Sequence, residues 1–178
     1  GRIAGEPRAP EAVRAEATRF LLETFEKGGS ATERPLAALA LGLAGLTGEA
    51  EKPEEYRYAL AEKVREKLAT LRGDRSALGA LALSLGMLGD RRQETLDLLT
   101  GILEKRGLDD RLRGAAAIAL GLIGDPSSKE TILTTLGERA DRRLRTDVAV
   151  AAGLLGDAEA EVALVEVLND RRVSQFEL

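Results

Sequence analysis

A short apolar phrase recurs four times along the chain. Each copy is rich in alanine and leucine and contains two glycines three positions apart, at residues 38–45, 82–89, 117–124 and 149–156. The first glycines of the four copies are Gly42, Gly86, Gly121 and Gly153, which lie 44, 35 and 32 residues apart. Repeat lengths of this size are typical of stacked helix pairs. The pattern therefore predicts an all-α solenoid.

Helix starts and ends can be placed relative to these glycines. Twelve positions before them stand Ser30, Asp74, Asp109 and Asp141, residue types whose side chains accept hydrogen bonds from free amides at a helix start. The second glycines, which suit a left-handed turn at a helix end, are Gly45, Gly89, Gly124 and Gly156. We expect each first glycine to let the next helix approach closely, so that Gly121→Val destabilises the fold by more than about 1 kcal/mol.

Amphipathic segments follow each phrase and predict a second helix per repeat, over 56–71, 93–105 and 159–168. In the third repeat, Ser127 and Glu130 have the spacing of a capping box. An N-terminal helix is expected to begin at Pro10 and stop at Gly28. We therefore expect one structural domain, with this helix in 1–29, repeats over 30–73, 74–108, 109–140 and 141–170, and a short tail to 178. Such an array is compatible with being a piece of a longer protein.

The segment from Arg113 to Pro126 resembles a HEAT repeat, of the short bacterial kind also found in phycobilisome lyases, and the resemblance extends over about Ser30 to Asn169. It implies a right-handed α-α superhelix of the HEAT or armadillo type, with about four helix pairs plus the N-terminal helix. It also implies a polar ladder between repeats, built from a turn aspartate and an arginine. The matching residues are Asp90, Asp125 and Asp157 with Arg34, Arg113 and Arg145, and Leu78 interrupts the arginine series.

Composition narrows the possible chemistry. The 178 residues are 44% hydrophobic and 31% charged, as expected of a folded, soluble array. Cysteine and histidine are absent, which excludes disulfides, thiolate nucleophiles, imidazole acid–base groups and the usual zinc ligands. The glycines end helices and no Gly-Lys-Ser/Thr follows them, so they are not a phosphate-binding loop. We expect no catalytic residue, cofactor or metal, no membrane segment and a cytoplasmic location.

Arginines gather at the turns that lead out of the second helices. They are Arg72, Arg75, Arg106, Arg111, Arg139, Arg142 and Arg143. Stacking places these turns along one edge, where guanidinium groups can bind carboxylates or phosphates of an extended partner. Aspartates in the same turns favour the alternative of exposed salt bridges that contribute little. The formal net charge of −4 argues against nucleic acid as the partner.

Two further surfaces are candidates for binding. By the resemblance, the second helices line the concave side, and the polar residues expected there are Lys63, Lys67, Glu94, Asp97, Glu138 and Glu161. This acidic face suits a basic or amphipathic segment, unless it serves only to solvate the helices. Tyr56 and Tyr58 are a candidate aromatic anchor for a protein partner. Being two residues apart on a helix, they cannot share a face, so we expect one in the core and one exposed.

These observations favour a non-catalytic scaffold or regulatory module that binds a protein partner over an extended surface. The alternative from another class is a lyase or maturation-type enzyme, or its accessory subunit, related to the phycobilisome-lyase proteins. Nucleic-acid binding by the basic edge is a lesser alternative. An apolar cleft that holds ionisable groups with opposed pKa shifts would favour the enzyme, and an open, charged surface would favour the scaffold.

Overall fold

A computed structural model describes residues 11–27, 30, 32–47, 53–138, 141–156 and 158–169. All regular structure in this part of the chain is helical, which confirms the predicted all-α class. The helices are α1 (Glu11–Lys27), α2 (Glu33–Thr47), α3 (Pro53–Thr70), α4 (Arg75–Leu88), α5 (Gln93–Glu104), α6 (Asp110–Ile123), α7 (Lys129–Leu136), α8 (Arg142–Leu155) and α9 (Ala158–Asn169), with a 3₁₀ turn η1 (Pro126–Ser128) before α7.

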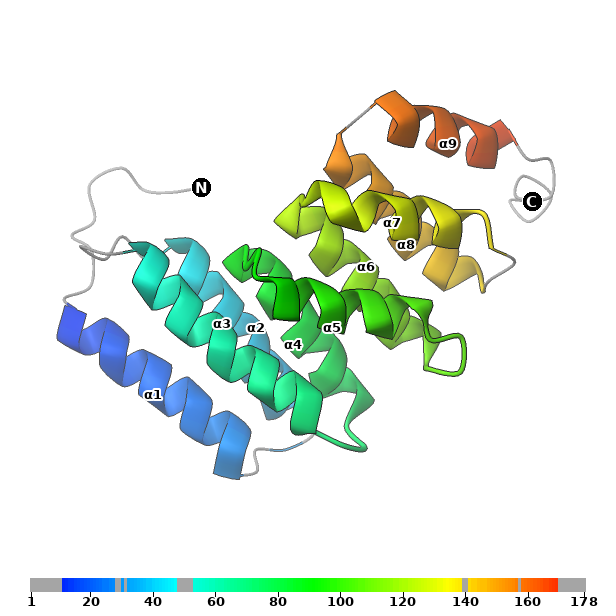
Figure 1. Cartoon of the computed structure of the whole chain (residues 1–178). Helices are drawn as coiled ribbons and strands as arrows, with labels where there is room; N and C mark the ends of the chain where they lie inside the picture. The colour runs from blue at the N-terminus through cyan, green and yellow to red at the C-terminus, as the bar shows by residue number, and fades with distance from the viewer. Residues whose placement is uncertain are drawn as a thin grey trace.

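The helices form two layers (Figure 1). The first-helix layer consists of α2, α4, α6 and α8, each packed extensively on the next, and the second-helix layer consists of α3, α5, α7 and α9. The N-terminal helix α1 packs against α2. The core between the layers joins Leu85 and Leu120 of the first layer to Leu99 and Ile132 of the second, all four without solvent exposure. This is the predicted solenoid.

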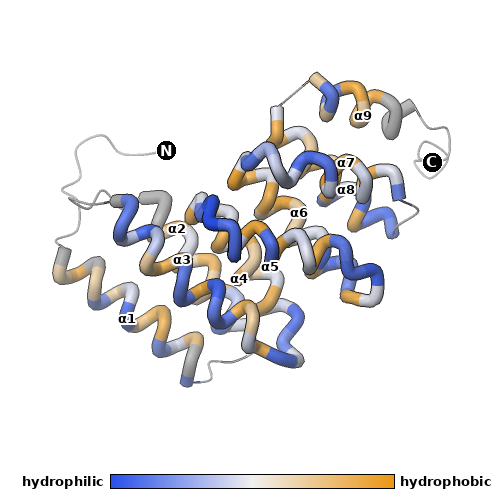
Figure 2. Tube along the Cα trace, in the orientation of Figure 1, coloured by the Kyte–Doolittle hydropathy of each residue, from blue (hydrophilic) through white to orange (hydrophobic). Residues whose placement is uncertain are grey.

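Hydropathy differs between the layers. Figure 2 shows apolar residues dominating α4 and α6, whereas α3 carries many hydrophilic residues.

A bilayer-spanning helix needs about 20 mostly apolar residues. No helix in the described ranges combines the length and the apolar character that this requires.

Side-chain caps start the first helices where the sequence predicts them. Ser30 Oγ accepts a hydrogen bond from the backbone N–H of Glu33 at 3.2 Å, and the Glu33 carboxylate accepts one from the Ser30 N–H at 2.7 Å. Asp74, Asp109 and Asp141 each accept one from a backbone N–H two or three residues later, at 2.8 to 3.0 Å. All four predicted caps are confirmed, and they hold the first helices in a common register.

Glycine ends three of the four first helices. Gly89, Gly124 and Gly156 have φ angles of 66°, 64° and 66°, in the left-handed region that disfavours residues with a Cβ. The prediction is wrong for Gly45, because α2 continues past it to Thr47.

The turn before α7 also differs from its prediction. The Asp125 carboxylate accepts hydrogen bonds from the Ser127 N–H at 3.0 Å and the Ser127 hydroxyl at 2.6 Å. Pro126 then opens η1, and α7 begins only at Lys129. The predicted capping box of Ser127 and Glu130 is therefore wrong, because the aspartate two residues earlier takes the capping role.

Close helix packing explains three of the four first glycines. A Cβ built on Gly86 would lie 2.6 Å from the Ala119 Cα, and one built on Gly121 would lie 2.7 Å from the Ala151 backbone oxygen. Gly42 lies against α4 in the same way. At Gly153 the nearest atom to a built Cβ is a leucine methyl at 4.0 Å, so the predicted close approach is absent there.

Candidate functional site

A groove of about 620 Å³ opens on the first-helix layer, near the starts of its helices. Its walls come from four consecutive first helices and the turn before α6. They include Pro35 of α2, Leu83 of α4, Arg111 of α6 and Arg143 of α8. A single groove thus touches first helices from α2 to α8, and we call the side of the first-helix layer on which it lies the inner side.

One face of each first helix continues this inner side as a stripe. In each repeat, four residues lie on one face of the first helix, because they are three or four positions apart. They stand ten, six and three positions before the first glycine of the repeat and one position after it. These stripe residues are Thr32, Leu36, Leu39 and Leu43; Ser76, Ala80, Leu83 and Met87; Arg111, Ala115, Ile118 and Leu122; and Arg143, Asp147, Val150 and Leu154. Aliphatic side chains on the stripe are well exposed, including Leu36 at 59%, Leu43 at 53% and Val150 at 48%. The inner side is therefore an apolar surface open to solvent.

Arginines line one end of the groove. Arg75 is the first residue of α4, and Arg111 and Arg143 are the second residues of α6 and α8. Among the described residues only Arg75 of the three forms an ion pair, in which its Nη1 lies 3.0 Å from Asp109 Oδ2. A hydrogen bond from the Arg111 backbone N–H, together with the charge of Arg75, holds the pKa of Asp109 below its ordinary value. The groove thus carries three arginines against one aspartate.

The predicted row of arginines divides in the structure. Arg75, Arg111 and Arg143 line the groove together. Arg72 instead donates hydrogen bonds to two backbone carbonyls at the end of α3, and Arg106 forms a 2.9 Å ion pair with Glu138. Arg142 is exposed beside Arg143, and Arg139 lies outside the described residues. Some arginines of the predicted row therefore line the groove, and others form hydrogen bonds or ion pairs within the chain outside it.

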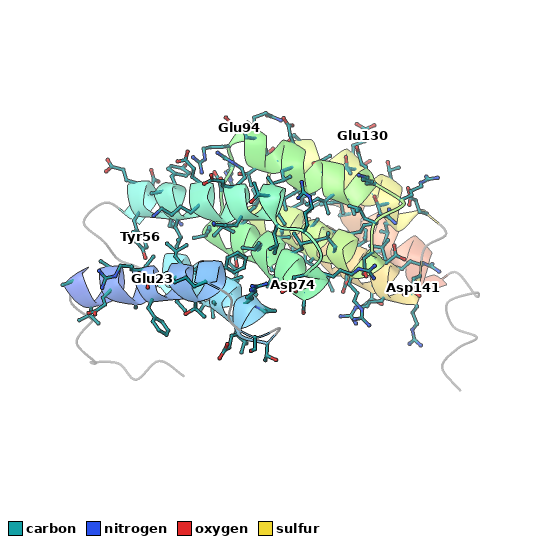
Figure 3. All side chains as sticks on the ribbon, turned by 90° about the horizontal axis from the view of Figure 1, so that it is seen from below. Glu23, Tyr56, Asp74, Glu94, Glu130 and Asp141 are labelled. Atoms are coloured by element: carbon teal, nitrogen blue, oxygen red, sulfur yellow. The ribbon has the colours of Figure 1, made fainter. Side chains whose placement is uncertain are left out.

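The acidic face expected on the second helices lies on the other layer from the groove. Lys63 and Lys67 belong to α3, Glu94 and Asp97 to α5, and Glu161 to α9; none of them lines the groove. Glu94 lines a separate cleft of about 480 Å³ between α3 and α5. Figure 3 shows Glu94 and Glu130 projecting from the opposite side to Asp74 and Asp141.

The first helices pack more closely on one another than the second helices do. Gly86 and Gly121 bring neighbouring first helices into backbone contact, whereas the second helices, such as α5 and α7, touch each other less. A layer with closer helix spacing becomes the inner side of a curved array.

Glu138, also predicted for the acidic face, is instead held by arginines. Its carboxylate accepts hydrogen bonds from Arg106 at 2.9 Å and from Arg113 at 3.2 Å. Burial raises the pKa of Glu138, but these two hydrogen bonds outweigh that effect and hold the pKa below its ordinary value. Glu138 therefore serves to tie the end of α7 to α6.

The polar ladder implied by the resemblance is not formed as expected. Arg113 is buried and donates to the Leu103 carbonyl at 2.8 Å as well as to Glu138. Asp90, at 0% exposure, instead pairs with Arg92, whose Nε lies 2.8 Å from its Oδ1. Asp125 caps its own turn, and Asp157 lies outside the described residues. Arg34 lies 4.0 Å from Asp74, the capping residue of α4. The partners of the ladder residues therefore differ from repeat to repeat.

The two tyrosines occupy different faces of α3, as their spacing predicts. Tyr56 is half-buried against the core, and its hydroxyl lies 2.6 Å from the Thr18 Oγ1 of α1. Tyr58 is 43% exposed, and the Arg92 guanidinium lies 5.4 Å from the centre of its ring. Both rings make contacts within the chain on the layer away from the groove.

A half-buried carboxylate on the inner side was not predicted from the sequence. Asp147 of α8 packs over Gly114 of α6, and its Cβ lies 2.8 Å from the position of a built Gly114 Cβ. Burial raises the pKa of Asp147 above its ordinary value, and the charge of Arg143 offsets this only in part. The sequence feature that could have indicated this contact is Gly114, a glycine inside α6 that does not belong to the repeated pair of glycines.

We expect Asp147→Asn to raise the free energy of unfolding at neutral pH. Because the folded-state pKa of Asp147 is raised above 3.8, its charged form opposes folding, and stability is lost as pH rises from 3.8 through the raised value. The amide carries no charge to desolvate. Urea unfolding at acidic and neutral pH measures this, with the exposed Asp97→Asn as control; a less stable Asp147→Asn at neutral pH would contradict it.

Comparison with known proteins gives one match. Residues 105–175 match the family model of HEAT repeats. This range covers α6 to α9, including two of the three arginines of the groove and the apolar stripes of α6 and α8. No curated protein matches the chain.

Proposed function

We propose that this protein is a non-catalytic scaffold whose protein partner binds in the groove and along the stripe. The match of residues 105–175 to HEAT repeats, which generally mediate protein–protein interaction, supports this proposal. The exposed aliphatic side chains of the inner side carry this proposal. Leu43 of α2, Leu122 of α6 and Leu154 of α8 each directly follow the first glycine of their repeat and are 42% to 53% exposed. Val150 of α8, on the same stripe, is 48% exposed. Repeated exposure of large apolar side chains on one face marks an interaction surface.

The shape of the groove favours a macromolecular ligand. Small-molecule sites are usually enclosed and cover most of the ligand surface. This groove instead runs across several helices and continues into the open stripe. A segment of a partner protein can follow such a surface and contact each repeat in turn.

Two valine substitutions test the location of the binding surface. Val150 of α8 lies on the stripe and is 48% exposed, and Val162 of α9 lies on the second-helix layer and is 59% exposed. Aspartate at either position adds one charge to an exposed site. We expect Val150→Asp to weaken binding of a partner isolated from the source cells by about tenfold or more, equivalent to about 1.4 kcal/mol, because a charge is desolvated in the interface. Val162→Asp should bind like the parent protein.

The measurement is capture from lysate with identification by mass spectrometry, with and without nuclease, followed by affinity measurement on the purified partner. Equal affinities of the Val150→Asp and Val162→Asp proteins would exclude the first-helix layer as the binding surface. Capture that disappears after nuclease treatment would show a nucleic-acid ligand and overturn the scaffold proposal.

A further inference from the structure

The charge of the groove is opposite to that of the chain. The protein has a formal net charge of −4, yet three arginines face the groove against one aspartate. In the described part of the chain neither Arg111 nor Arg143 forms an ion pair within 4.0 Å, although Asp109 interacts electrostatically with Arg111 and Asp147 with Arg143. These two guanidinium groups are available to carboxylates of a ligand, which they can bind with two parallel hydrogen bonds.

The placement of the arginines does not serve helix stability. Basic side chains in the first turn of a helix lie at the positive end of its dipole, where they are unfavourable. Arg75, Arg111 and Arg143 all lie there, and the first turns of α4 and α8 contain no acidic residue. Residues that break a local rule in this way point to a functional role. In three successive repeats that role is the same, because all three side chains line the groove.

Arginines and exposed aliphatic side chains lie next to each other on the inner side. Along α6 the stripe passes from Arg111 to Ile118 and Leu122, and along α8 it passes from Arg143 to Val150 and Leu154. A ligand lying across these helices therefore meets arginines along one flank and aliphatic side chains along the other. Its own surface must be acidic on one side and apolar on the adjacent side.

The repeat distance is close to the spacing of residues along one face of an α-helix. Packed helices are about 8–10 Å apart, so equivalent positions on α4, α6 and α8 recur at that interval. An α-helix returns to the same face every two turns, after seven residues and about 10.5 Å. A β-strand returns to the same face after two residues, about 6.8 Å, and does not match. The helical period places one acidic side chain opposite Arg111 and one opposite Arg143, which occupy equivalent positions of α6 and α8.

We infer that the partner segment is an amphipathic α-helix that lies across α4, α6 and α8, with two acidic side chains, seven residues apart, facing Arg111 and Arg143. Its apolar flank packs on the aliphatic stripe. The inference rests on the proposed function and adds the chemistry and conformation of the ligand. The helix crosses the first helices of three repeats, so a single repeat binds it weakly.

Two synthetic helical peptides test the inference. Each has about three heptads with leucine on the apolar face; one carries glutamate at seven-residue intervals on the flank and the other carries lysine there. We expect the parent protein to bind the glutamate peptide at least about tenfold more tightly than the lysine peptide at low salt, as measured by fluorescence anisotropy.

Matched double variants locate the charge effect. Arg111→Glu with Arg143→Glu should reverse the preference, whereas Arg19→Glu with Arg142→Glu makes the same change in net charge outside the groove and should keep it. Arg19 is a well-exposed residue of α1, and Arg142 adjoins Arg143 but does not line the groove. Glutamate in the first turn of α6 or α8 favours the helix dipole, so the groove variant remains folded.

The outcomes separate this inference from the proposed function. The inference of an acidic helical partner would be overturned if the parent protein bound both peptides equally, or if the Arg111→Glu, Arg143→Glu variant kept the same preference. Neither outcome would change the expected difference in affinity between the Val150→Asp and Val162→Asp proteins. Failure of both peptides to bind would also overturn it. Equal affinities of the Val150→Asp and Val162→Asp proteins would instead exclude the first-helix layer as the binding surface of the proposed scaffold.

Discussion

We expect Asp90→Ala to lower the free energy of unfolding by about 3 kcal/mol, because removing one partner of a buried charge cluster leaves the others unpaired. Asp90 has no exposed surface. Its Oδ2 accepts hydrogen bonds from the Thr95 hydroxyl at 2.6 Å and from Arg92 Nη2 at 3.0 Å, and Arg65 Nη1 of α3 lies 3.7 Å away. The carboxylate thus joins α3 to the start of α5.

The same contacts predict how stability depends on pH. Burial raises the pKa of Asp90, but hydrogen bonds from Arg92 and Thr95 outweigh it and hold the pKa below 3.8. A lowered folded-state pKa means that the stabilisation is complete above 3.8 and is lost as pH falls through the lowered value. Asp90→Asn cannot titrate, so its stability should fall less steeply in acid than that of the parent protein.

Urea unfolding followed by circular dichroism over a series of pH values measures both effects. Asp97→Ala is the control, because Asp97 is an exposed aspartate of α5 that accepts a hydrogen bond from Gln93. Substitutions of exposed residues change stability by about 0.5 kcal/mol or less. If Asp90→Ala and Asp97→Ala destabilise the protein equally, the Asp90 cluster does not hold the two helices together.

Local features of the fold were predictable from the sequence because they depend on residues close along the chain. The caps at Asp74, Asp109 and Asp141 each need only a carboxylate and an amide two or three residues later. The polar ladder was not predictable in this way. Asp90 can meet an arginine from the next repeat or from its own turn, and the nearer residue Arg92 forms the pair.

The groove depends on information that the repeated phrase does not contain. Leu41 and Leu43 stand in the same apolar run, yet Leu41 is 1% exposed and Leu43 is 53% exposed. Which of these two leucines is buried depends on how the neighbouring helices pack, and α2 packs against α1, α3 and α4. The arginines could be recognised by their type, but only the stacking of the repeats brings Arg75 of α4 and Arg143 of α8 to one groove.

We expect the same substitution at equivalent positions of two repeats to have opposite effects on stability. Gly121→Ala should destabilise the protein by about 2 kcal/mol, because inserting a methyl into a filled contact costs about 1–3 kcal/mol. Its Cβ would lie 2.7 Å from the Ala151 oxygen and 2.9 Å from the Ala151 Cα. Both are backbone atoms, so α6 and α8 must move apart. Gly121→Val should destabilise more.

Gly153→Ala is the matched control, because Gly153 has the same place in the fourth repeat but no atom closer than 4.0 Å to a built Cβ. Alanine is more favourable than glycine within a helix by about 1 kcal/mol, so this variant should unfold at higher urea concentration than the parent protein. The difference arises because helix α8 covers Gly121, whereas only the Leu164 methyl approaches Gly153. Equal effects of the two alanines would mean that backbone contact between first helices does not set their spacing, and the curvature that forms the groove would then need another cause.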